Sequence, residues 1–139
     1  MMTLGMLIWD YQSENQNLIR QWADGIRLGK RDRALLDQKL DALEALEFDL
    51  ATHTHLVAGP LRSSKDKHIY KLRVNAGVMI RIMLCRGPLT GEAACTLLEG
   101  ATERDGRLVP ANAPEVAAKR REDVLGKPVD CRRKHERFS

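Results

Sequence analysis

The sequence predicts an α+β domain in which a small antiparallel sheet packs on two N-terminal helices. Between residues 36 and 50, leucines recur every three or four positions, which is the spacing of one helix face. From Tyr70 to Asn75, apolar and polar residues alternate as in a strand with one buried face. Short turn sequences join this segment to two further apolar runs, so the three strands are expected to form a meander.

The N-terminal third predicts one strand and two helices. Residues 6–9 form a short apolar run typical of a strand. Ser13 and Gln16 have the spacing of a capping box, which predicts a first helix that stops before Gly29. Asp32 can cap the second helix, whose leucine stripe extends to Leu50 and leaves the acidic residues on the other face.

The remaining elements give the order β-α-α-β-β-β-α. A last helix fits residues 112–126, with Asn112 as its cap, Pro114 in its first turn and Gly126 at its end. Residues 127–139 show no periodicity, so we expect one domain at 1–126 and a basic tail at 127–139. The other predicted segments are a loop at 53–60, strands at 69–75, 78–85 and 93–98, and a polar loop at 99–110.

Composition limits the possible functions. The chain of 139 residues can bury a core without disulfides, and its 43% hydrophobic and 30% charged content is that of a soluble domain. Aromatic residues make up only 4%, which argues against an aromatic platform for stacking bases. The net charge of +4 is modest, so its distribution matters more than its size.

The charges separate along the chain. Residues 32–49 are mainly acidic, whereas residues 62–86 contain only one acid, Asp66. The basic segment is therefore a candidate surface for binding anions. It contains Arg62, Lys65, Lys67, Lys71, Arg73, Arg81 and Arg86.

Several classes of site are not supported. Cys85, Cys95 and Cys131 lack metal-ligand spacing, so we expect no metal and no cofactor. No GxSxG, glycine-rich phosphate loop or HExxH motif is present. The first nine residues lack the basic start and cleavage site of a signal peptide and are too short to cross a membrane. We therefore expect a cytoplasmic protein.

Arg81 is the residue that most needs an explanation. It is the only charged residue in an otherwise apolar strand, and an unpaired buried charge costs several kcal/mol. Alternation places it on the sheet face that also carries Lys71 and Arg73, where three cations repel one another unless an anion joins them. A phosphate backbone would serve. The alternative is a solvated strand face on which Arg81 pairs with Glu92 or Glu99.

Five segments, in order, resemble the RelE/HigB superfamily of bacterial type II toxins, in particular its phage-derived, HigB-like branch. They cover roughly residues 6–126 and match that branch's leucine helix, its basic strand, its arginine strand, a motif after the third strand and a closing helix. The segments are LDALEAL, GPLRSSKDKHIYKLRV, IRIMLC, TLLEGATERDGRLVP and EVAAKRREDVL.

The resemblance implies a RelE-like fold and a metal-independent endoribonuclease, an mRNA interferase acting on the ribosome. It places Arg81 at the scissile phosphate, Glu99 as general base and Arg104 beside them as a third catalytic residue. His68 is an alternative proton carrier, although a histidine just outside a strand is commonly incidental. The residues expected to bind RNA are Lys65, Lys67, His68, Lys71, Arg73 and Arg107.

The chain also departs from that branch. The histidine of its third-strand motif is Glu99, the phenylalanine is Ala101, and the lysine pair is Thr102 and Glu103. These changes favour an alternative, a toxin-fold protein that inhibits another target such as DNA gyrase, as the ParE branch does, or a non-catalytic phage or regulatory protein. A third possibility is an unrelated α/β domain that binds nucleic acid without chemistry. The resemblance implies a helix-turn-helix antitoxin as partner and no membrane association.

Overall fold

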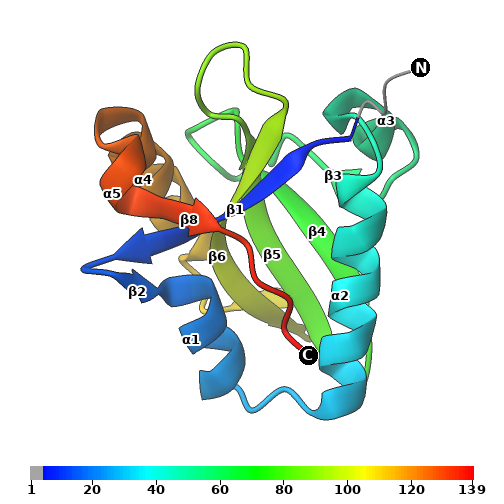
Figure 1. Cartoon of the computed structure of the whole chain (residues 1–139). Helices are drawn as coiled ribbons and strands as arrows, with labels where there is room; N and C mark the ends of the chain where they lie inside the picture. The colour runs from blue at the N-terminus through cyan, green and yellow to red at the C-terminus, as the bar shows by residue number, and fades with distance from the viewer. Residues whose placement is uncertain (1–4) are drawn as a thin grey trace.

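The computed structural model describes residues 5–139, which form five helices around a single, mostly antiparallel sheet (Figure 1). The α+β class is therefore confirmed. Six strands lie side by side in the order β2-β1-β6-β5-β4-β3, while β7 pairs with β6 and β8 with β1. The strands are β1 (Leu7–Ser13), β2 (Gln16–Asn17), β3 (Val57–Ala58), β4 (Tyr70–Asn75), β5 (Met79–Arg86), β6 (Ala94–Arg104), β7 (Arg107–Val109) and β8 (Arg132–Lys134).

The meander of β4, β5 and β6 is antiparallel, as predicted. The first strand joins it by running parallel to β6, with Leu7 opposite Ala94 and Asp10 opposite Leu97. The other edge of β1 pairs with β8, which comes from the far end of the chain. The predicted element order omitted β2, β3, β7 and β8 as well as two short helices, so it was wrong in detail.

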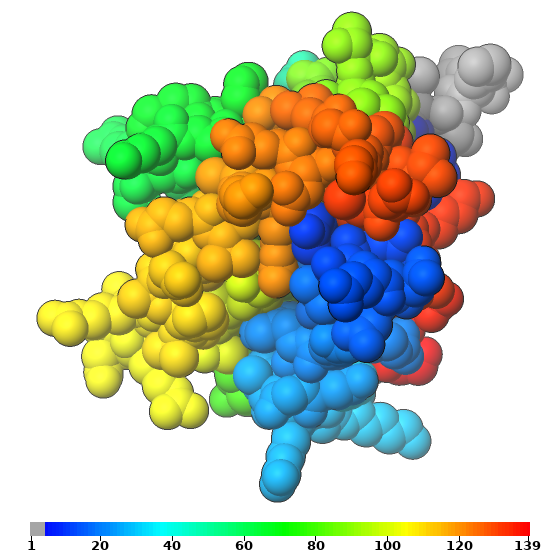
Figure 2. All heavy atoms as spheres, turned by 90° about the vertical axis from the view of Figure 1, so that its left-hand side faces the viewer, coloured from blue at the N-terminus to red at the C-terminus, as the bar shows by residue number. Residues whose placement is uncertain are grey.

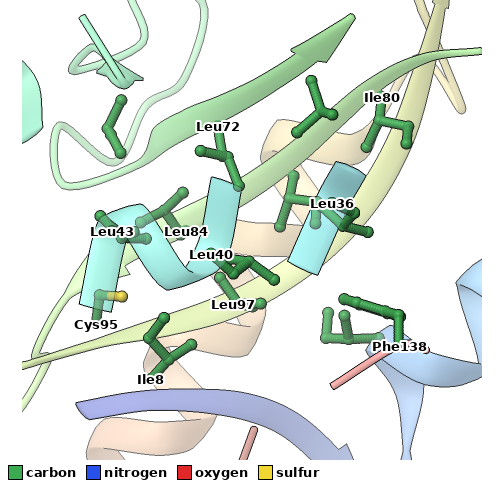
Figure 3. Close-up of a cluster of buried hydrophobic side chains, with 14 of the residues drawn as sticks. Ile8, Leu36, Leu40, Leu43, Leu72, Ile80, Leu84, Cys95, Leu97 and Phe138 are labelled. Carbon is green, nitrogen blue, oxygen red and sulfur yellow. The ribbon is translucent and has the colours of Figure 1, made fainter. Parts of the chain in front are cut away.

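One face of the sheet packs on α2 (Lys30–Glu44), which carries the predicted leucine stripe. Leu36, Leu40 and Leu43 are at most 2% exposed and belong to the cluster that includes Leu72 and Leu84 of the sheet. Figure 3 shows these side chains between the helix and the strands, with Phe138 at the edge of the cluster. The helix ends earlier than predicted, and α3 (Phe48–His53) follows as a separate element.

The opposite face is only partly covered. The last long helix, α4 (Ala113–Gly126), begins after Asn112 as predicted and packs over one part of this face. A second apolar cluster forms there, containing Met83, Cys85, Leu98, Ala113 and Ala117. Figure 2 looks onto this side, with α4 in orange and the β6–β7 hairpin in yellow projecting beside it.

The first helix starts differently from the prediction. Ser13 and Gln16 pair across a β1–β2 hairpin, and Glu14 and Asn15 between them both adopt positive φ, as a tight turn of this type requires. Asn17 is the actual cap of α1 (Leu18–Gly25), since its side chain accepts hydrogen bonds from the N–H groups of Ile19 and Arg20. The capping-box interpretation was therefore wrong.

Residues 127–139 are part of the fold, in contrast to the predicted basic tail. They form α5 (Pro128–Cys131) and β8, and the chain then crosses between α1 and α2 (Figure 1). Phe138 enters the core and is 4% exposed. The Asp37 carboxylate accepts hydrogen bonds from the N–H groups of Phe138 and Ser139 and from the Ser139 hydroxyl. His135 contacts the buried carboxylate of Asp10 at 2.8 Å.

Candidate anion-binding site

The strand register brings the predicted cations together. Arg73 lies directly opposite Arg81, and Lys71 lies two pairs further along, opposite Met83. Their neighbours in sequence, among them Leu72 and Ile80, point into the core on the other face. Lys71, Arg73 and Arg81 therefore share one face, which we call the basic sheet face.

Arg81 is almost completely buried, with 5% of its surface exposed. Its partner is Glu103, which neither of the predicted pairings named. The Arg81 Nε and Nη2 groups donate to the two Glu103 carboxylate oxygens at 3.3 and 3.4 Å. The Nη1 group donates to the Ile80 carbonyl at 2.8 Å and to the Asn75 Oδ1 atom at 3.1 Å. The buried charge is thus paired and hydrogen-bonded, as its burial requires.

The electrostatic balance of this face remains positive. Burial lowers the pKa of Lys71, and the nearby Arg73 and Arg81 lower it further, while Glu103 acts in the opposite direction. Glu103 is one carboxylate among three cations, and 31% of its side chain is exposed, against 7% for Arg81. The basic sheet face can therefore take up a further anion, most directly at the solvent-exposed Arg73.

Glu99 does not belong to this cluster. Its side chain pairs with Arg120 of α4 at 3.3 Å and accepts a hydrogen bond from the N–H group of Gly100. Arg120 also lies 4.8 Å from the ring centre of Tyr11, so Glu99 takes part in holding α4 on the sheet. Burial raises the pKa of Glu99, and the pairing with Arg120 acts in the opposite direction.

Arg104 and Arg107 lie opposite each other at the end of the β6–β7 hairpin. Both are exposed, and the turn between them has positive φ at Asp105 and Gly106. They project from the same end of β6 that carries Glu103, which makes them available to a long ligand that crosses the basic sheet face.

Lys65, Lys67 and His68 lie at the other end of β4, before Tyr70. Lys67 is engaged within its own loop, since its ammonium donates to the carbonyls of Arg62 and Ser64. His68 is exposed and lines a separate cleft of about 550 Å³. The structure thus groups Lys71, Arg73 and Arg81 with Glu103. Lys65, Lys67 and His68 lie apart from this group.

Sequence reasoning missed Glu103 because residues 99–110 were expected to be a loop. The Asp105-Gly106 pair is a strong signal for a hairpin turn, and it would have extended the third strand through Glu103. For Asn75, the alternation of its strand predicts only that it lies on the polar side.

No helix within residues 5–139 is both long enough and apolar enough to span a membrane.

Comparisons with family models, with curated proteins and with solved structures find no match for this chain.

Proposed function

We propose that this protein is the toxin of a type II toxin–antitoxin system and cuts messenger RNA on the ribosome. The observation that carries the proposal is the basic sheet face, on which Lys71, Arg73 and Arg81 lie together beside one carboxylate. The RNA backbone bears one negative charge per nucleotide, which suits a row of cations on neighbouring strands. The resemblance of the sequence to RelE/HigB toxins supports the same function.

The chemistry would use the 2′-hydroxyl of the RNA as nucleophile. Its oxygen attacks the adjacent phosphorus, the bond to the 5′-oxygen breaks, and the products are a 2′,3′-cyclic phosphate and a free 5′-hydroxyl. The protein must then position the strand, accept one proton and stabilise the negative charge that develops on the phosphate. Lys71 and Arg73 fit the positioning role, and the Arg81 guanidinium fits the charge-stabilising role.

Activity of this kind would require a neutralising partner. We propose a helix-turn-helix antitoxin encoded beside the toxin, with acidic or apolar segments that cover the basic sheet face or the helices. A protein that acts on ribosomes would work in the cytoplasm. Arg104 and Arg107 on the exposed hairpin would contribute further contacts with RNA phosphates.

One observation favours a second function. The Arg81 charge is already satisfied by Glu103, Asn75 and the Ile80 carbonyl, which suits a structural ion pair. A toxin-fold protein that inhibits another target, such as DNA gyrase, would need no free cation there. The two functions differ in whether RNA is cut.

The test is to map messenger 5′ ends in a translating extract supplied with the protein or its Arg81→Ala variant. We expect new ends with the parent and none with Arg81→Ala, with folding checked by circular dichroism. Arg86→Ala is the matched control, because Arg86 lies on the same strand but is exposed and pairs with Asp49 at the surface. If the parent arrests growth without producing new ends, the nuclease proposal fails and the gyrase alternative is favoured.

A further inference from the structure

The ion pair of Arg81 with Glu103 places a carboxylate where a ligand phosphate would bind. Both Glu103 oxygens face the Nε and Nη2 side of the guanidinium, which is the forked arrangement that arginine also offers to phosphate oxygens. Glu103 therefore occupies this side of Arg81 in the free protein. A phosphate can reach it only if Glu103 moves away.

The contacts of the two residues indicate which one moves. Arg81 is held from its other side by the Ile80 carbonyl at 2.8 Å and by Asn75 at 3.1 Å, so the guanidinium keeps its place without Glu103. Glu103 bonds to Arg81 at longer distances of 3.3 and 3.4 Å, and its side chain is 31% exposed. It also lies near the solvent-exposed end of β6, one residue before Arg104.

We infer that an RNA phosphate displaces Glu103 from Arg81, and that the released Glu103 carboxylate then accepts the proton of the neighbouring 2′-hydroxyl. This inference rests on the proposed function. Displacement frees both oxygens of the Glu103 carboxylate from Arg81 at the moment when the substrate is in place, so one of them can accept the proton. The proton passes to the carboxylate, the 2′-oxygen bonds to phosphorus, and the departing 5′-oxygen takes a proton from solvent.

The assignment replaces Glu99 as the general base. Glu99 is engaged with Arg120 and with the N–H group of Gly100, on the part of the sheet that α4 covers. Glu103 is the carboxylate in contact with Arg81, and no other carboxylate of residues 5–139 pairs with that guanidinium.

Two measurements on Glu103→Gln test the inference. The first is the affinity for a single-stranded RNA oligonucleotide made uncleavable by 2′-deoxy substitution, determined for the parent, Glu103→Gln, Arg81→Lys and the double variant. We expect Glu103→Gln to bind at least several-fold more tightly than the parent. The gain should disappear in the Arg81→Lys background, because without the guanidinium Glu103 and the phosphate no longer compete for the same fork.

The second measurement is single-turnover cleavage of the unmodified RNA in the translating extract. Glu103→Gln should cut about a hundredfold or more slowly, the effect usual for loss of a general base, in spite of its tighter binding. Unfolding cannot produce these opposite changes. Glu92→Gln is the matched control, since both Glu92 oxygens accept hydrogen bonds from the Nη1 and Nη2 groups of Arg132, at 2.7 and 2.9 Å, away from the basic sheet face. Both measurements should stay at the parent level.

The outcomes separate the inference from the function on which it rests. Cleavage by Glu103→Gln at the parent rate would overturn Glu103 as proton acceptor and leave the nuclease intact. A gain in affinity that persists with Arg81→Lys would overturn the displacement. If the parent itself produces no cuts, the nuclease proposal fails and the proton transfer fails with it.

Discussion

Replacement of Phe138 by alanine tests whether the C-terminal segment is part of the cooperative core. Phe138 is 4% exposed and packs in the cluster that contains the leucines of α2. Truncation of a buried phenylalanine to alanine costs about 3–5 kcal/mol, a large share of the roughly 5–15 kcal/mol that stabilises a typical domain. With a urea m-value of about 2 kcal/mol/M, the unfolding midpoint should fall by about 1.5–2.5 M.

The assay is urea unfolding followed by circular dichroism at 222 nm, with slope and midpoint fitted separately. Val129→Ala is the control from the same C-terminal segment, because Val129 is 87% exposed and its truncation should change stability by less than about 0.5 kcal/mol. Equal midpoints for the two variants would refute the reasoning. They would mean that residues 132–139 contribute nothing to the core in solution.

Three further predictions concern packing, pH and thiol reactivity. A Cβ atom at Gly100 would lie 2.0 Å from the Trp22 ring, so Gly100→Ala should lower the free energy of unfolding, measured in urea, by about 1–3 kcal/mol. In the double variant, Trp22→Leu should remove most of this loss. Burial alone would raise the pKa of Asp37, but hydrogen bonds from the last two residues outweigh it and the pKa lies below its usual value. The stability that this lowered pKa provides is present above the pKa of Asp37 in the unfolded state and is lost as the pH falls through its pKa in the folded state. Asp37→Asn should therefore make the melting temperature depend less steeply on pH below about pH 4. Burial raises the pKa of Cys85 to about 12, so iodoacetamide at pH 8 should modify the partly exposed Cys131 and spare Cys85 until urea unfolds the protein; equal rates for both thiols would contradict this.

The spacing of apolar residues predicted those helices and strands whose buried face is visible within their own sequence. The leucines of α2 and the alternation in β4 each specify a buried face, and both elements formed as expected. Pairing between distant segments was not predictable in this way. β1 pairs with β6 in parallel and with β8 in antiparallel orientation. These pairings depend on which strand edges meet in three dimensions, and no short sequence pattern encodes that.

The C-terminal segment is rich in charged residues and still has a structural role. Residues 132–137 contain five basic or histidine side chains and resemble a solvated terminus. The anchors of the segment include single residues on other elements, such as Asp10 for His135 and Asp37 for the last two residues. A lone apolar residue such as Phe138 has no periodicity, so sequence patterns assign it no partner.

The candidate site was predictable in part for the same reasons. The need of Arg81 for a counter-charge follows from its place in an apolar strand, and the shared face with Lys71 and Arg73 follows from alternation. The identity of the counter-charge depends on how far β6 extends beyond the bulge between Met83 and Leu84. That bulge shifts the register, so the strand pattern of β5 alone could not select Glu103.

The pairing of β1 with β8, from the far end of the chain, has a consequence for how the chain folds. Its Asp10 meets His135, 125 residues later in the sequence, and Asp37 meets Ser139 across 102 residues. Contacts of such length make folding slow, because the loop between the partners must close before any energy is gained. During synthesis the part of the β1 edge at residues 9–11 therefore stays unpaired until residues 132–134 have left the ribosome, and a chaperone or partner that covers this part of the edge would act on the nascent chain.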